Sequence, residues 1–109
     1  MNPKHEKLID DLLRKTAAGE VEWEETDAPN QFALKLKRGA ILIEKSFGLL
    51  SIGNFTITLL NNEGNQIDRF GTIGEQYRGV VQELYEIIDR RVSRVDEQID
   101  EIIGELETL

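Results

Sequence analysis

Three residue patterns follow one another along this chain, and their order limits the folds open to it. A helical repeat comes first, a block of alternation follows, and a longer helical repeat runs to the last residues. Within the middle block, side chains alternate between two kinds in Phe32–Lys37 and again in Phe55–Leu59, as in strands with two different faces. Helices and strands that are segregated along the chain are typical of the α+β class. The sequence predicts an N-terminal helix, a four- or five-stranded antiparallel sheet, and one or two C-terminal helices packed on one sheet face.

The first helix is predicted to run from about Pro3 to Ala18. Asn2 can cap it, and Pro3 suits the first helical position, where the missing N–H costs no hydrogen bond. Gly19 is placed to end the helix, because glycine readily adopts the left-handed conformation found after helices. The apolar stripe of this helix consists of Leu8, Ile9, Leu12 and Leu13.

The strand block is divided by turn residues such as those at Asn61–Gly64. The predicted strands lie around Val21 and Trp23, at Phe32–Lys37, at Ala40–Ser46, at Phe55–Leu60 and at Gln66–Phe70. Trp23 is expected in the core or at its edge.

A two-residue loop at Arg38-Gly39 is predicted to join the two strands of the clearest hairpin. In this register Leu36 pairs with Ile41 and Leu34 with Ile43, which gives the hairpin one apolar face.

The C-terminal helical region is predicted to contain two helices. Thr72–Glu75 reads as a capping box, in which the threonine and glutamate side chains each satisfy a backbone N–H. A break is expected near Val92–Arg94, and Ser93 with Asp96 gives a weaker second capping signal. One continuous helix is the alternative. The apolar stripe after the break consists of Val95, Ile99, Ile102, Ile103 and Leu106.

Composition bounds the functions open to the chain. Its 109 residues suit one domain spanning residues 1–109, and the absence of cysteine excludes disulfides and thiolate sites. The net charge of −8 opposes nucleic-acid binding, and no apolar run approaches the roughly 18 residues of a membrane span. We therefore expect a cytoplasmic protein with no nucleic-acid partner and no membrane partner.

No motif for catalysis, a metal or a cofactor stands out. The paired acids fall on predicted polar faces of helices and of the first strand, and His5, the only histidine, is expected to be exposed in the first helical turn. The serines lie outside any nucleophile motif. The sequence therefore predicts no enzyme activity, no cofactor and no tight transition-metal site.

Two groups of residues are candidate sites. Arg90, Arg91 and Arg94 could bind an anion, although arginines near a helix end also complement its dipole. The apolar loop after the third strand could close the core or form a contact patch. The candidate interface consists of Phe47, Leu49, Leu50, Ile52, Leu42 and Leu60.

Several segments spread over most of the chain carry a resemblance to known proteins: Leu12–Thr16, Gly19-Glu20, Trp23, Asn62–Gly64, Leu84–Glu86, Arg90-Arg91 and Asp96-Glu97. In these segments the chain resembles small bacterial proteins of unknown function. The resemblance implies a helix, an antiparallel sheet and C-terminal helices, and it implies no catalytic residues.

These patterns favour a non-enzymatic protein–protein interaction or accessory module, with an unknown protein partner and a possible homodimer. The dimer would use the sheet face that holds Lys35, Leu42, Glu44, Thr56, Thr58 and Leu60. The alternative is a small-ligand or anion-binding domain that uses the open sheet face and the arginine cluster. A pocket with converging acids and arginines would favour this alternative.

Overall fold

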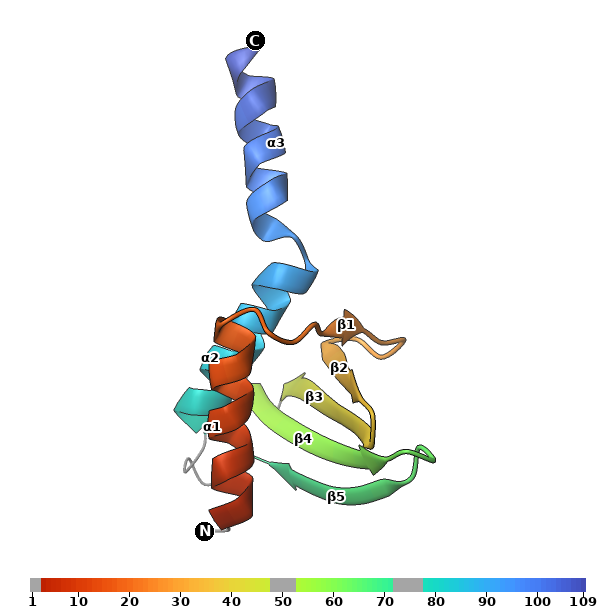
Figure 1. Cartoon of the computed structure of the whole chain (residues 1–109). Helices are drawn as coiled ribbons and strands as arrows, with labels where there is room; N and C mark the ends of the chain where they lie inside the picture. The colour runs from red at the N-terminus through yellow and green to blue at the C-terminus, as the bar shows by residue number, and fades with distance from the viewer. Residues whose placement is uncertain (1–2, 48–52, 72–77) are drawn as a thin grey trace.

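The structure is a computed structural model that describes residues 3–47, 53–71 and 78–109. It confirms the predicted α+β fold, with a helix, a five-stranded antiparallel sheet and two further helices (Figure 1). The elements are α1 (Pro3–Ala17), β1 (Glu24–Glu25), β2 (Gln31–Leu36), β3 (Gly39–Phe47), β4 (Gly53–Asn61), β5 (Gln66–Gly71), α2 (Arg78–Val92) and α3 (Val95–Glu107).

The five strands form a meander in the order β1-β2-β3-β4-β5, and every neighbouring pair is antiparallel. Short connections favour this order, because a strand that follows a tight turn pairs most readily with the strand before it. The last pair changes register between Leu59 and Leu60, where β4 meets β5.

The β2–β3 hairpin has a different register from the predicted one. Leu36 pairs with Gly39 and Leu34 with Ile41, so the loop is Lys37-Arg38 and the pairing is displaced by two residues. In the observed register Gly39 lies against β4, where a side chain would overlap the carbonyl oxygen of Leu60, so this pairing requires a residue without a Cβ at that position. A two-residue displacement keeps every side chain on its predicted face.

The first strand is shorter than predicted and lies later in the chain. β1 contains only Glu24 and Glu25, whereas Val21 and Trp23 precede it. Trp23 is nevertheless buried, as expected, and its indole Nε1–H donates to the hydroxyl of Thr16 at 3.0 Å. Alternation at Val21 and Trp23 therefore reflects packing against α1 rather than strand pairing.

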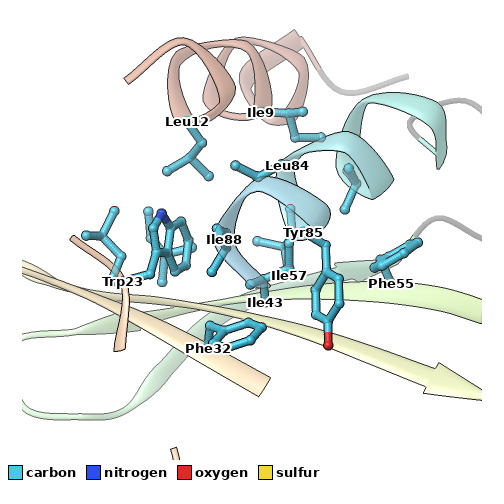
Figure 2. Packing of buried hydrophobic residues seen from close by; sticks show 13 residues of the cluster. Ile9, Leu12, Trp23, Phe32, Ile43, Phe55, Ile57, Leu84, Tyr85 and Ile88 are labelled. Carbon is cyan, nitrogen blue, oxygen red and sulfur yellow. The ribbon is translucent and has the colours of Figure 1, made fainter. Parts of the chain in front are cut away.

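The core lies between one face of the sheet and the helices α1 and α2 (Figure 2). Ile43 and Ile57 point from the sheet toward Leu84 and Ile88 of α2, and Ile9 approaches from α1 (Figure 2). The remaining buried apolar residues of this cluster are Leu12, Trp23, Phe32, Leu34, Ile41, Phe55, Val81 and Tyr85. We call the opposite face of the sheet the outer face.

The end of α1 agrees with the prediction. Gly19 has φ +75°, and its N–H donates to the Thr16 carbonyl at 3.1 Å. The N–H of Glu20 donates to the carbonyl of Lys15 at 3.0 Å, which completes a glycine-dependent helix cap. This cap turns the chain toward β1.

The Asn2 cap and the Thr72–Glu75 capping box fall outside the described residues. In the part of the chain that is described, no helix has both the length and the apolarity needed to cross a bilayer.

Candidate functional site

The C-terminal helix α3 exposes an apolar stripe and is the most unusual surface feature among the described residues. Figure 1 shows α3 projecting away from the sheet and α1, with α2 as its neighbour. The exposed fractions are 45% for Ile99, 58% for Ile102, 47% for Ile103 and 63% for Leu106. Their spacing places them on one face over two helical turns. α3 therefore presents a continuous apolar face to solvent.

The rest of α3 is strongly acidic. Between Val95 and Glu107 the helix carries Asp96, Glu97, Asp100, Glu101, Glu105 and Glu107, and it has no lysine or arginine. The absence of cations in the last turn leaves the negative end of the helix dipole uncompensated by side chains of α3. The surface thus combines an apolar face with a high negative charge.

The junction between α2 and α3 confirms the predicted break but corrects its cap. Arg94, not Ser93, is the N-cap residue of α3, and its backbone is left-handed at φ 53° and ψ 41°. The Ser93 hydroxyl donates to Asp89 at 3.1 Å instead of capping α3. The amide of Gln98 holds the turn by donating to the Ser93 carbonyl at 2.8 Å. This single left-handed residue directs α3 away from the axis of α2 (Figure 1).

The arginine cluster is largely committed to contacts within the chain. The guanidinium of Arg91 donates to the carbonyls of Thr16 and Ala17, the latter at 3.0 Å, and so caps the C-terminal end of α1. Arg94 approaches Glu97 at 3.8 Å. Arg90 is exposed at the end of α2 and has interactions of its own. The cluster's clearest role is to join α1 to the α2–α3 junction.

A cavity of about 640 Å3 lies beside this cluster, between the end of α1, the start of β1 and the end of α2. Trp23 and Ile88 form part of its apolar wall, while Arg91 and Arg94 lie on its lining. The remaining lining residues are Thr16, Gly19, Val21, Glu22, Glu24, Glu25 and Val92. Acids and arginines therefore converge here, which is the feature expected of a binding pocket.

The structure describes three of the six candidate interface residues: Leu42, Leu60 and Phe47. Leu42 and Leu60 are half-buried on the outer face, and Phe47 ends β3. Leu49, Leu50 and Ile52 lie outside the described residues. The structure thus places only the sheet part of this predicted patch.

His5 differs from its predicted environment. It is half-buried, its ring stacks on Phe70 of β5 with centroids 3.8 Å apart, and its Nε2 hydrogen-bonds Asp68 at 2.7 Å. The hydrogen bond from His5, together with the backbone N–H of Arg69, lowers the pKa of Asp68. The contact crosses from α1 to β5, which periodicity in either segment could not indicate.

Among the titratable groups that the structure describes, two others are perturbed by their surroundings. Burial raises the pKa of Tyr85, with a smaller contribution from the carboxylate of Asp89. A hydrogen bond and the charge of Lys15 lower the pKa of exposed Glu20. Within residues 3–47, 53–71 and 78–109, no three histidine, aspartate or glutamate side chains gather in a metal-binding group. The perturbed groups are widely separated and do not form a joint acid–base site.

The fold defines a class: a small α+β domain in which two helices cover one face of an antiparallel meander and a third helix extends beyond it. No protein-family model matches the chain, and comparisons with curated proteins and with solved structures found no match. The surfaces of this molecule are therefore the observations that bear on its function.

Proposed function

We propose that this protein is a non-enzymatic protein–protein interaction or accessory module and that α3 is its contact element. The observation that carries the proposal is the exposed apolar stripe at Ile99, Ile102, Ile103 and Leu106. Contiguous apolar patches are uncommon on monomeric proteins and often mark interaction sites. The α3 stripe contributes nothing to the core between the sheet, α1 and α2.

The length of α3 supports the same interpretation. An isolated helix of 13 residues is marginally stable in water, because few hydrogen bonds offset the loss of backbone entropy. Burying an isoleucine or leucine side chain stabilises by about 1.5–3 kcal/mol. A partner surface that covers the stripe would therefore supply both affinity and helix stability. Amphipathic helices that bind apolar grooves use this spacing of anchors.

The proposal is tested by comparing three purified baits in extracts of the source organism. The baits are the natural chain, Ile102→Glu and the matched polar-face variant Glu97→Gln. We expect proteins identified by mass spectrometry to bind the natural chain and Glu97→Gln, and to be lost with Ile102→Glu. Equal recovery of the same proteins by all three baits would contradict a contact through α3.

The cavity beside Trp23 supports a second candidate, a small-ligand or anion-binding domain. Arg94 on its lining suits an anion and its indole wall suits an apolar group, whereas the glutamates on the same lining oppose a high negative charge. Titration with inorganic phosphate, followed by Trp23 fluorescence, tests this candidate. We expect a saturable change that Arg94→Gln weakens and that the exposed α1 variant Lys7→Gln leaves intact. An unsaturable or absent change would contradict it.

Two broader expectations belong to this proposal. The resemblance to small bacterial proteins of unknown function assigns no activity to the chain, and the cytoplasm is the compartment we propose. Neither supplies a partner, which must come from the chemistry of the contact surfaces.

A further inference from the structure

We propose that the stripe of α3 packs on the outer face of a second copy of this chain, so that two copies exchange their C-terminal helices. This inference rests on the proposed role of α3 as a contact element, and it names the partner. Each chain would offer one helix and receive one, which gives a closed dimer with twofold symmetry. Three observations support it: the composition of the outer face, the distribution of charge and the area of contact.

The outer face has a moderately apolar centre. The pairing places Ala33 beside Leu42 and Leu42 beside Thr58, and the next row pairs Ala40 with Leu60. Except for Ala33, which is buried, these side chains are half-buried. Side chains of this size leave a shallow surface against which branched residues of a helix can pack. α1 and α2 cannot fill this role, because they pack against the other face.

The distribution of charge favours the outer face, rather than a second α3, as the surface that α3 contacts. α3 has six acidic residues and no basic one, so two copies side by side would bring twelve carboxylates together. The outer face carries Lys35 and Arg69 against Glu24 and Glu44, so its charges balance and it repels α3 less than a second α3 would. Arg69 pairs with Thr58 on the outer face, and the exposed Lys35 lies near its edge with Glu24 at 3.1 Å. Glu24 neutralises Lys35 and Glu44 is the second acid of this face, so attraction to the acidic α3 concentrates at Arg69.

The area of contact favours a reciprocal exchange over a single contact. A 13-residue helix is about 20 Å long and about 10 Å wide, so one contact removes roughly 600–800 Å2 of accessible surface from both chains together. Stable protein complexes bury about 1,200–2,000 Å2. Two exchanged contacts reach about 1,200–1,600 Å2, whereas one α3–α3 contact does not.

The test measures molar mass by light scattering after size exclusion, using the full chain over a range of concentrations. We expect the natural chain to form a dimer, and Ile102→Glu and Leu42→Glu each to raise its dissociation constant about tenfold or more. Because Leu42 is half-buried, Arg69→Glu serves as a second outer-face variant at an exposed residue. Lys7→Glu makes the same charge change on α1 and should leave the dimer unchanged.

Mixing the variants separates exchange from other dimers. In an exchanged dimer, Ile102→Glu retains a natural outer face and Arg69→Glu retains a natural α3, so the mixture keeps one intact contact. We expect the mixed dimer, detected by native mass spectrometry, to be tighter than either variant with itself. If only Ile102→Glu abolishes the dimer, the dimer forms by α3–α3 pairing. If only the outer-face variants abolish it, the dimer forms by sheet–sheet pairing. Either result would overturn the exchange.

Different results would overturn the exchanged dimer and the proposed role of α3 as a contact element. A natural chain that stays monomeric at high micromolar concentration would overturn the exchanged dimer. Recovery of another protein by the natural chain and not by Ile102→Glu would still support α3 as a contact element. If Ile102→Glu alters neither self-association nor recovery, both proposals fail.

Discussion

Thr16 shows at the scale of one residue how α1, the segment before β1 and α2 are joined. Its side chain is fully buried, and its hydroxyl accepts the indole N–H of Trp23. Its carbonyl accepts from the guanidinium of Arg91. In the sequence, Thr16 is a polar residue near a helix end and gives no sign of these long-range contacts.

We predict that Thr16→Val destabilises the fold by about 1–3 kcal/mol, because the Trp23 N–H stays buried without an acceptor. Thr16→Val with Trp23→Phe should show a smaller loss than the sum of the single variants. Chemical denaturation of the four proteins in this cycle measures the coupling. Additive losses would show that the hydrogen bond is unimportant.

We predict that Leu84→Ala destabilises the fold by about 2–5 kcal/mol, because the side chain is fully buried between α1 and the sheet. The adjacent exposed position supplies the control, and Glu83→Ala should change the unfolding free energy little. An unchanged denaturation midpoint for Leu84→Ala would show that this helix face is not in the core.

The contact between His5 and Asp68 predicts a dependence on pH. The pKa of Asp68 is lowered in the folded state from its ordinary value of 3.8, so its contribution to stability is present above 3.8. This contribution is lost as the pH falls through the folded-state pKa. As the pH falls from 7 to below 3.8, the unfolding free energy of Asp68→Asn should therefore decrease less than that of the natural chain. The unfolding free energy of Asp10→Asn should decrease as it does in the natural chain. Parallel denaturation profiles for Asp68→Asn and the natural chain would contradict this link.

At the scale of elements, local signals predicted most boundaries. Helix starts and ends depend on contacts between neighbouring backbone atoms, which residues such as Pro3 and Gly19 control. The observed α1, its C-terminal cap and the separation of α2 from α3 after Val92 therefore agree with the prediction. The predicted β2–β3 register was wrong, and the local pattern gave no sign that Gly39 lies against β4, which is distant in sequence. Val21 and Trp23 resembled a strand because packing on α1 also produces alternating burial. Pairing and packing across the chain are therefore what local patterns missed.

We predict that Gly39→Ala destabilises the sheet by about 1–3 kcal/mol, because the new methyl group would collide with the backbone of β4. The same substitution at Gly104 in α3 meets no heavy atom within 4 Å and should raise helix stability by about 0.5–1 kcal/mol. Thermal unfolding followed by circular dichroism compares the two. A neutral Gly39→Ala would contradict the close approach of β3 and β4.

At the scale of the whole molecule, the sequence predicted which surfaces are apolar but not which of them are buried. The stripes of α2 and α3 have the same helical period, yet the first is in the core and the second is exposed. The difference arises at Arg94, whose left-handed backbone turns α3 away. The arginine cluster was found from its spacing, whereas its bonds to α1 required the assembled fold.

The central claim is that α3 gains its stability from another chain, and hydrogen exchange at several protein concentrations tests it most directly. At low concentration we expect rapid exchange in α3 and slow exchange in α2, because α3 lies outside the core. At high concentration we expect α3 to become protected, while the natural chain and Glu97→Gln behave alike and Ile102→Glu stays unprotected. Protection of α3 that does not depend on concentration or on Ile102 would contradict the account.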